Sequence, residues 1–127
     1  MWNSSEAAGL LAAVQAYFDL MYEGDLSTFE AVFAPSAQLT GLRDGQMTVL
    51  SAASYREVLA GRAAPKSQGA PREEQVLLLD FASPTQALVK LRVRVGPTRF
   101  VDYLTYHRVG GTWLVTSKGY HAEPVPG

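Results

Sequence analysis

Two ionisable side chains that could exchange protons, Asp102 and His121, lie in the last two strands that the sequence predicts. These strands cover residues 100–107 and 113–121, with Gly110-Gly111 as a two-residue hairpin turn between them. Burial raises the pKa of a carboxylate and a neighbouring imidazolium lowers it, so such a pair can be tuned for proton transfer. Ionisable groups among large aromatic residues suggest the wall of a small-molecule pocket, but they do not name the molecule.

The alternation of side chains along these two strands decides which residues share a face. With a two-residue turn, Val109 pairs with Thr112, and Asp102 becomes a diagonal neighbour of His121, about 7 to 8 Å away at the backbone. We expect this face to line the pocket because it carries a Trp and is otherwise apolar around the two ionisable groups. A one-residue bulge would reverse the assignment. The predicted interior set is Phe100, Asp102, Leu104, Tyr106, Trp113, Val115, Ser117, Gly119 and His121.

Structural interpretations of the same residues stay open. Asp102 could hold Lys118 or a backbone amide instead of acting on a ligand, and His121 could lie at a frayed strand end. Tyr103, Lys118 and His107 fall on the opposite face of the predicted hairpin.

Three helices are predicted ahead of this hairpin. Asp25 can cap a second, shorter helix, which has ended by Pro35, and Ser51 or Ser54 can cap the third, which is closed by Gly61. The first helix is amphipathic, stops at Gly24, and has apolar residues at helical spacing, namely Leu10, Leu11, Val14, Tyr17, Phe18 and Met21.

The remaining segments alternate as strands do. Residues 37–43 and 46–49 flank Asp44-Gly45, which tolerates the positive φ angles of a tight turn. Residues 62–72 read as a surface loop, and after them a period of two predicts long antiparallel strands through residues 77–95. Within that stretch Lys90, Arg92 and Arg94 share the outer face.

Composition excludes several classes of function. The chain has 127 residues, 47% of them hydrophobic and 18% charged, which fits one domain over residues 1–127 with a substantial core. A formal charge of −1 and a short basic stripe favour neither nucleic acid nor anionic lipid as a partner. No apolar run reaches the length of a membrane span, and no basic leader opens the sequence, so a cytoplasmic protein is the expectation.

Metal and cofactor chemistry have no support in the sequence. The chain has no cysteine and two histidines fourteen residues apart, which is no zinc spacing, and its acidic residues form no calcium loop. A phosphate-binding glycine motif and a nucleophile elbow are both missing. We therefore expect no metal and no cofactor.

The order of helices and strands, over about residues 10–121, resembles the nuclear transport factor 2-like superfamily, which includes ketosteroid isomerase and the SnoaL-like cyclases. Within it the chain is most similar to the putative lumazine-binding branch. The residues that carry this likeness are Phe100, Asp102, Tyr103, Leu104, Gly111, Trp113, Lys118, Tyr120 and His121. The resemblance implies an α+β, cone-shaped fold in which three N-terminal helices pack on a curved, mainly antiparallel sheet. It also implies a homodimer through the outer sheet face, with Tyr103 and Lys118 supporting the interface.

The resemblance to ketosteroid isomerase is incomplete. The isomerase has a Tyr on its first helix, and Tyr17 lies as far before Gly24-Asp25 as that Tyr lies before a Gly-Asp pair. In the isomerase the phenol of this Tyr donates a hydrogen bond to a developing enolate oxygen. Where the isomerase has its Asp base, however, this chain has Gly41. The isomerase reaction is therefore not expected, and Tyr17 is either a pocket donor or a core aromatic.

Three hypotheses of function follow. The first is a pocket protein that binds a small molecule, such as a lumazine-like heterocycle. The second is a cofactor-free isomerase, dehydratase or cyclase in which Asp102 or His121 moves a proton and Tyr17 stabilises an oxyanion. The third is a non-catalytic structural or interaction domain, whose cavity would be filled by side chains. The predicted ligand-binding residues are Phe18, Phe33, Tyr55, Phe100, Leu104, Tyr106, Trp113 and Ser117.

Overall fold

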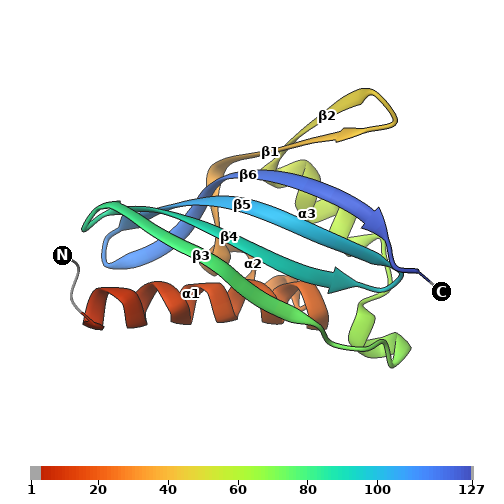
Figure 1. The fold of residues 1–127 in the computed structure, drawn as a ribbon, viewed down its shortest axis with the longest axis horizontal. Helices are drawn as coiled ribbons and strands as arrows, with labels where there is room; N and C mark the ends of the chain where they lie inside the picture. The colour runs from red at the N-terminus through yellow and green to blue at the C-terminus, as the bar shows by residue number, and fades with distance from the viewer. Residues whose placement is uncertain (1–3, 127) are drawn as a thin grey trace.

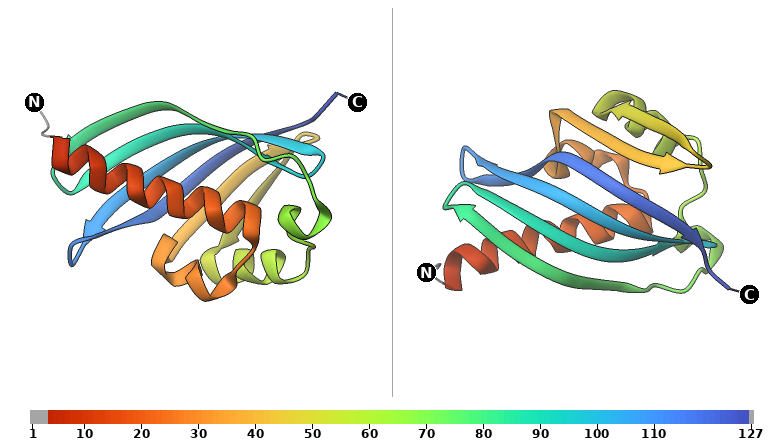
Figure 2. Two further views of the ribbon diagram at one scale, coloured as in Figure 1. Left: turned by 90° about the horizontal axis from the view of Figure 1, so that it is seen from below. Right: turned by 45° about the horizontal axis from the view of Figure 1, so that its top comes forward.

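Six strands form one curved mixed sheet with helices packed against its inner face (Figures 1 and 2). The strand order is β2-β1-β6-β5-β4-β3; β1 and β6 run parallel, and the other neighbours are antiparallel. The computed structural model describes residues 4–126. Its strands are β1 Phe33–Arg43, β2 Gln46–Ser51, β3 Glu74–Ser83, β4 Gln86–Val95, β5 Thr98–Val109 and β6 Thr112–Pro124. Its helices are α1 Ser4–Glu23, α2 Phe29–Val32 and α3 Ala52–Ala60, with short 3₁₀ turns at Leu26–Thr28 and Pro65–Gln68.

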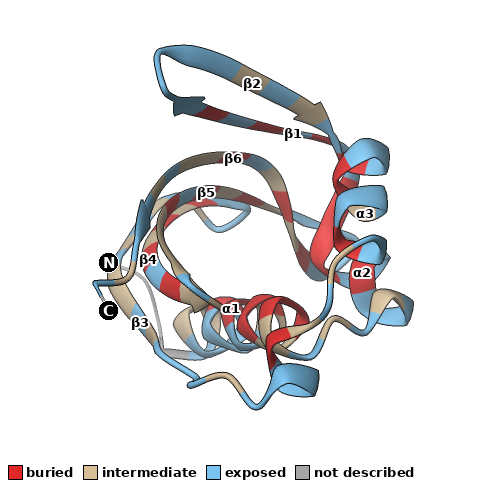
Figure 3. Ribbon diagram, turned by 90° about the vertical axis from the view of Figure 1, so that its right-hand side faces the viewer, coloured by how far each residue is buried: buried red, intermediate tan, exposed pale blue. Residues whose placement is uncertain are grey.

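The buried side of α1 faces the inner side of the curved sheet, while α3 packs against β1 and β2 (Figure 3). Leu10, Val14, Tyr17 and Met21 follow one another at helical spacing and are all buried, as predicted from their periodicity. They meet a row of inward β4 side chains, Ala87, Val89, Leu91 and Val93. The outer face of β4 carries Lys90, Arg92 and Arg94, also as predicted.

The predicted second helix is too long. Asp25 does cap this segment, since its carboxylate accepts a hydrogen bond from the Ser27 amide, but the helix ends at Val32. Phe33 already pairs with Val115 of β6 and belongs to β1. Pro35 lies where the β1–β6 pairing is irregular, between Phe33 and Gln38, so its missing N–H breaks no regular ladder there. Sheet pairing of Phe33 therefore outweighs the helical pattern that the sequence suggests.

A β-bulge in β6 changes which of its residues face the interior. Val109 pairs with Thr112 across the Gly110-Gly111 turn as predicted, but Thr105 pairs with Ser117 and Tyr106 with Val115. Thr116 is thus the extra residue, and its hydroxyl donates a hydrogen bond to the Thr105 carbonyl at 3.3 Å. After Thr116 the alternation is reversed for the rest of the strand.

Within residues 4–126, no helix is long and apolar enough to cross a membrane.

Candidate active site

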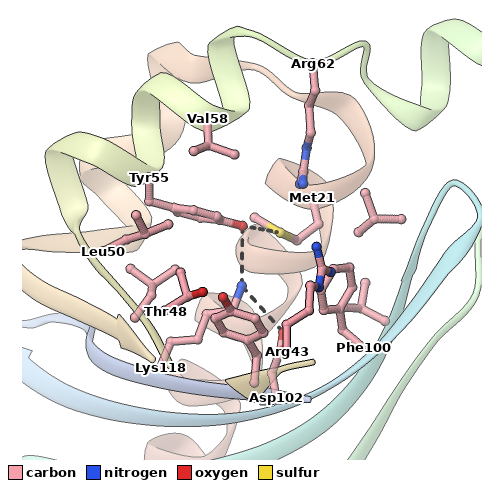
Figure 4. Close-up of a pocket in the computed structure, with 14 residues that line it drawn as sticks. Met21, Arg43, Thr48, Leu50, Tyr55, Val58, Arg62, Phe100, Asp102 and Lys118 are labelled. Carbon is pink, nitrogen blue, oxygen red and sulfur yellow. Dashed lines mark hydrogen bonds and ion pairs between the residues drawn. The ribbon is translucent and has the colours of Figure 1, made fainter. Parts of the chain in front are cut away.

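A cavity of about 190 Å³ opens between the sheet, α1 and α3. Its walls are mostly apolar and include Leu50 from β2, Val58 from α3, and the rings of Phe100 and Tyr120 from β5 and β6. Figure 4 shows the polar groups that enter it from several elements. They are Arg43, Thr48, Tyr55, Arg62, Asp102 and Lys118.

Asp102 and Lys118 form an ion pair at the base of this cavity. The Lys118 Nζ lies 3.8 Å from Asp102 Oδ2 and donates a hydrogen bond to the Tyr55 hydroxyl at 3.3 Å. Tyr17, from α1, donates a hydrogen bond to the same Asp102 Oδ2 at 2.5 Å. The Tyr55 hydroxyl in turn contacts the Met21 sulfur at 3.4 Å. Two strands and two helices therefore bring one connected polar group together.

Both charges of this pair are buried, with Asp102 0% and Lys118 6% exposed. An isolated buried charge is strongly disfavoured, so the pair is tolerated because each charge compensates the other. Three aromatic rings also surround the ammonium, with centroids 4.8 Å away for Tyr55, 5.3 Å for Tyr17 and 5.8 Å for Tyr120. Burial, the largest single influence, lowers the pKa of Lys118, but the Asp102 carboxylate and the Tyr55 hydroxyl together outweigh burial, so the net result is a raised pKa. Lys118 is therefore an ammonium at neutral pH.

Some hydrogen-bonding capacity at this site is unused. Among residues 4–126, neither Asp102 Oδ1 nor the buried Tyr106 hydroxyl has a hydrogen-bond partner. Burial, followed by the charge of Asp102, raises the pKa of Tyr17 and of Tyr106, so both phenols keep their protons. Asp102 thus has one oxygen that is held by Tyr17 and one that is free to accept.

The structure brings together part of the predicted site. Asp102, Tyr55 and Phe100 line the cavity, and Tyr17 contacts Asp102 from the α1 side. Trp113 instead lies at the far end of α1, where its Nε1 would be 3.6 Å from a Cβ at Gly9. The other predicted ligand contacts are core residues that do not line this cavity, namely Phe18, Phe33, Leu104 and Tyr106.

The predicted placement of Ser117 and His121 inside the sheet is wrong, because the Thr116 bulge turns both residues outward. The His121 side chain is 67% exposed and its Nε2 lies 3.7 Å from Glu123. His121 pairs with Val101, not diagonally with Asp102 through the interior, so the expected Asp102–His121 pair does not form. Lys118, expected on the outer face, takes the interior position. Asp102 does contact Lys118, one of the two structural partners that the sequence suggested for it.

Sequence reasoning also missed the contribution of the β1–β2 hairpin and of the chain after α3. Arg43 and Thr48 belong to the former and Arg62 to the latter. For Arg43 a signal was available, because strict alternation from Leu39 through Gly41 places it on the inner face of β1. The position of Arg62 depends on how the segment after α3 packs.

The sequence matches the family described as "Putative lumazine-binding" over residues 5–121. The chain belongs to this family. A curated relative, "Aldolase FrzH" from Cladobotryum sp, is 26% identical over 124 residues, which cover 96% of this chain and 95% of that protein.

Solved structures show the same fold for this member of the Putative lumazine-binding family. A nuclear transport factor 2-like protein of unknown function from Silicibacter pomeroyi is 23% identical, with a TM-score of 0.85 and coverage of 97% of this chain and 100% of that chain. A ketosteroid isomerase-like protein from Erwinia carotovora atroseptica is 15% identical, with a TM-score of 0.74 and coverage of 97% and 100%. The fold is therefore that of the nuclear transport factor 2-like superfamily.

Gly41 has a packing role in this family member. A Cβ at this position would lie 2.3 Å from the Tyr120 ring, which covers Gly41 and forms part of the cavity wall. A larger residue at position 41, such as an Asp, would need the space that Tyr120 fills. The packing of Tyr120 against Gly41 therefore leaves no room for an Asp base at this position.

Replacing Gly41 by Ala is expected to destabilise the protein by about 1–3 kcal/mol, because the Tyr120 ring must leave its place over β1. Urea denaturation measures this change. Gly61→Ala is the control, since its φ of −88° suits any residue and a Cβ there would make only ordinary contacts, the nearest at 3.6 Å, so it should change stability by less than about 0.5 kcal/mol. Equal effects of the two substitutions would contradict the packing role of Gly41.

Alkaline pH is expected to destabilise the protein steeply. The pKa values of Lys118, Tyr17 and Tyr106 are raised in the folded state, so above about pH 10 the unfolded chain loses these protons first. Their stabilisation is complete below the unfolded pKa values and is lost at about 1.4 kcal/mol per pH unit for each group above them. Urea denaturation between about pH 8 and 11 measures the slope. Tyr106→Phe should reduce the slope of stability against pH by about 1.4 kcal/mol per pH unit, the contribution of one group. An unchanged slope would contradict the raised pKa of Tyr106.

Within residues 4–126, no group of three or more His, Cys, Asp or Glu side chains is placed to hold a metal ion.

Proposed function

We propose that this protein is a cofactor-free enzyme that moves a proton next to the carbonyl group of a small molecule bound in the cavity. The observation that carries the proposal is the buried Lys118–Asp102 pair, which lies at the base of the cavity and is joined to Tyr17. A fixed cation beside a carboxylate is suited to forming an enolate, because one group stabilises the oxygen and the other accepts the proton.

Lys118 is the proposed partner of the carbonyl oxygen. One of its N–H groups faces Tyr55, and the 3.8 Å separation from Asp102 Oδ2 is longer than a hydrogen bond, so the ammonium is not fixed on the carboxylate. The raised pKa of Lys118 favours electrostatic stabilisation of an oxyanion over a Schiff base, which requires a neutral amine. The aromatic surroundings keep this charge in a place where its field is weakly screened.

Asp102 is the proposed proton acceptor. Its Oδ2 is occupied by Tyr17, whereas its Oδ1 has no partner among the described residues. Asp102 is fully buried, so we propose that Lys118 moves toward the ligand oxygen and gives the substrate carbon access to the carboxylate. Tyr17 is a positioning residue in this scheme, because it touches Asp102 and fixes its orientation.

The aldolase relative supports a reaction that passes through an enolate. In the first step the α C–H bond breaks, its electron pair forms the enolate, and the proton goes to Asp102. Return of that proton to another carbon is isomerisation. In aldol addition the enolate carbon forms a bond to a second carbonyl carbon, and the oxygen of that carbonyl takes the proton. Neither route needs an oxidant or a reductant.

The test follows deuterium from solvent into the α-position of methyl 3-benzoylpropionate and of 3-benzoylpropionate by NMR. The protein should accelerate exchange in at least one of these ketones, and Asp102→Asn should slow the catalysed exchange by about 10²-fold or more while binding is retained. Asp80→Asn, on the exposed side of β3, is the matched control and should exchange at the wild-type rate. No acceleration with either ketone contradicts the proposal.

Binding without turnover is the second candidate, favoured by the family's description and by the aromatic walls of Tyr55, Phe100 and Tyr120. It would make the protein a carrier of a heterocycle such as lumazine. Calorimetry with lumazine separates the candidates, because a carrier should bind the ring tightly, show no catalysed exchange, and keep that affinity in Asp102→Asn. A structural domain with a filled cavity is less well supported, since the cavity is open.

We also propose that the protein is cytoplasmic and forms a homodimer through the outer face of its sheet. The outer side of β1, β2 and β5 carries exposed apolar side chains, among them Met47, 64% exposed, and Tyr103, 46% exposed, around a shallow apolar hollow beside Gly119. Sedimentation of the wild type should give the mass of two chains, and Tyr103→Glu should shift it to one. A wild-type monomer at about 100 µM would contradict the dimer.

A further inference from the structure

Two arginines reach the same cavity. Arg43 is the last residue of β1 and Arg62 follows α3, and both extend toward the cavity in Figure 4. Within the described part of the chain, neither guanidinium takes part in an ion pair or a hydrogen bond to a side chain. Other arginines of this protein do pair with carboxylates, namely Arg56, Arg72, Arg94 and Arg99.

The charges around the cavity are unbalanced. Its charged lining, over the described residues, consists of Arg43, Arg62 and Lys118 against a single carboxylate, Asp102, which already faces Lys118. Arg62 is close enough to oppose the positive charge of Lys118, since its own charge acts to lower the pKa of that lysine. An anionic group on a ligand would relieve this repulsion, and low-dielectric walls such as Phe100 and Val58 would strengthen its attraction to the arginines.

The two arginines stand where the cavity meets a second hollow of about 360 Å³. Both spaces are lined by Arg43, Arg62, Val95 and Phe100, and Pro65 and Pro97 also line the second hollow. A ligand whose carbonyl reaches Lys118 and which extends toward the second hollow would therefore pass the arginines. Planar guanidinium groups bind carboxylates through paired hydrogen bonds, which a lysine cannot match.

We infer that the substrate class is a small carbonyl compound that also carries a carboxylate, with the carbonyl at Lys118 and the carboxylate held by Arg43 and Arg62. The placement of the carbonyl rests on the proposed function, whereas the carboxylate site stands on the arginines alone. Affinity is then expected to depend on the acid group of the ligand, on both arginines and on ionic strength.

The test is calorimetric titration of the full chain with 3-benzoylpropionate and with its uncharged methyl ester. The acid should bind at least about tenfold more tightly than the ester, and Arg43→Gln and Arg62→Gln should each remove most of that difference while ester binding stays the same. Arg56→Gln is the matched control, because Arg56 lies on α3 and pairs with Glu30 outside the cavity. Thermal denaturation of each variant verifies that it is folded.

Three results would overturn the inference: equal affinity for acid and ester, an acid affinity that both arginine variants retain, or no binding of the acid by the wild type. These results are separable from failure of the proposed function. Arginine-dependent binding of the acid without deuterium exchange would reject the enzyme and keep the carboxylate site. Catalysed exchange of the ester with no preference for binding the acid would keep the enzyme and reject the carboxylate site.

Discussion

Lys118→Met is expected to slow deuterium exchange into the ketone probes by about 10²- to 10³-fold. The substitution keeps an unbranched side chain of similar length but removes the only ammonium among the described residues that line the cavity. Removal of one donor to a developing oxyanion has an effect of this size when the site is shielded from water. Because the enolate is charged and the ketone is not, the loss should fall mainly on kcat.

Lys66→Met is the matched control for this experiment. Lys66 is 65% exposed and lies 4.0 Å from Glu23, away from the cavity, so its loss changes the net charge equally and should leave exchange unchanged. If Lys118→Met exchanges the ketones at the wild-type rate while remaining folded, Lys118 has no catalytic role. Lys118→Arg provides a further check, since it keeps a positive charge and should recover part of the rate.

A double-mutant cycle on Lys118 and Asp102 is expected to show strong coupling in stability. Asp102→Asn leaves a buried ammonium without its counter-charge, and Lys118→Met leaves a buried carboxylate supported by Tyr17 alone. Each single change should destabilise the fold by about 3–5 kcal/mol, the range found when one partner of a buried ion pair is removed. The double variant has no unpaired charge, so it should be more stable than the sum of the single changes predicts by at least about 1 kcal/mol.

Urea denaturation of the four proteins at neutral pH completes the cycle. Additive effects of the two substitutions would show that the two charges do not compensate each other, and would contradict the Lys118–Asp102 ion pair. The double variant also protects the kinetic test, because it remains available for exchange measurements if Lys118→Met alone does not fold. It should be as slow as either single variant, since both proposed roles have been removed.

Local patterns in the sequence determined much of this fold. The apolar spacing of α1 identifies Tyr17 as an inward residue, the Asp44-Gly45 and Gly110-Gly111 turns have the positive φ angles that were expected, and strict alternation places Asp102 inside β5. These features depend on neighbours within a few residues, where backbone geometry leaves few choices. The resemblance to the nuclear transport factor 2-like superfamily is confirmed for the same reason, since it rests on the order of these elements.

Only the tertiary structure decided which ionisable residue of β6, Lys118 or His121, faces the cavity. The bulge at Thr116 turns Lys118 inward and His121 outward, and sequence alternation cannot show it because either register satisfies a strand pattern. Burial of Lys118 is acceptable only where Asp102 and three aromatic rings already converge, while the exposed end of β6 leaves His121 in solvent. The bulge leaves Thr116 without a partner in the ladder, but it allows Lys118 to reach Asp102. These long-range contacts therefore set the register of β6, and the register sets which side chains the cavity contains.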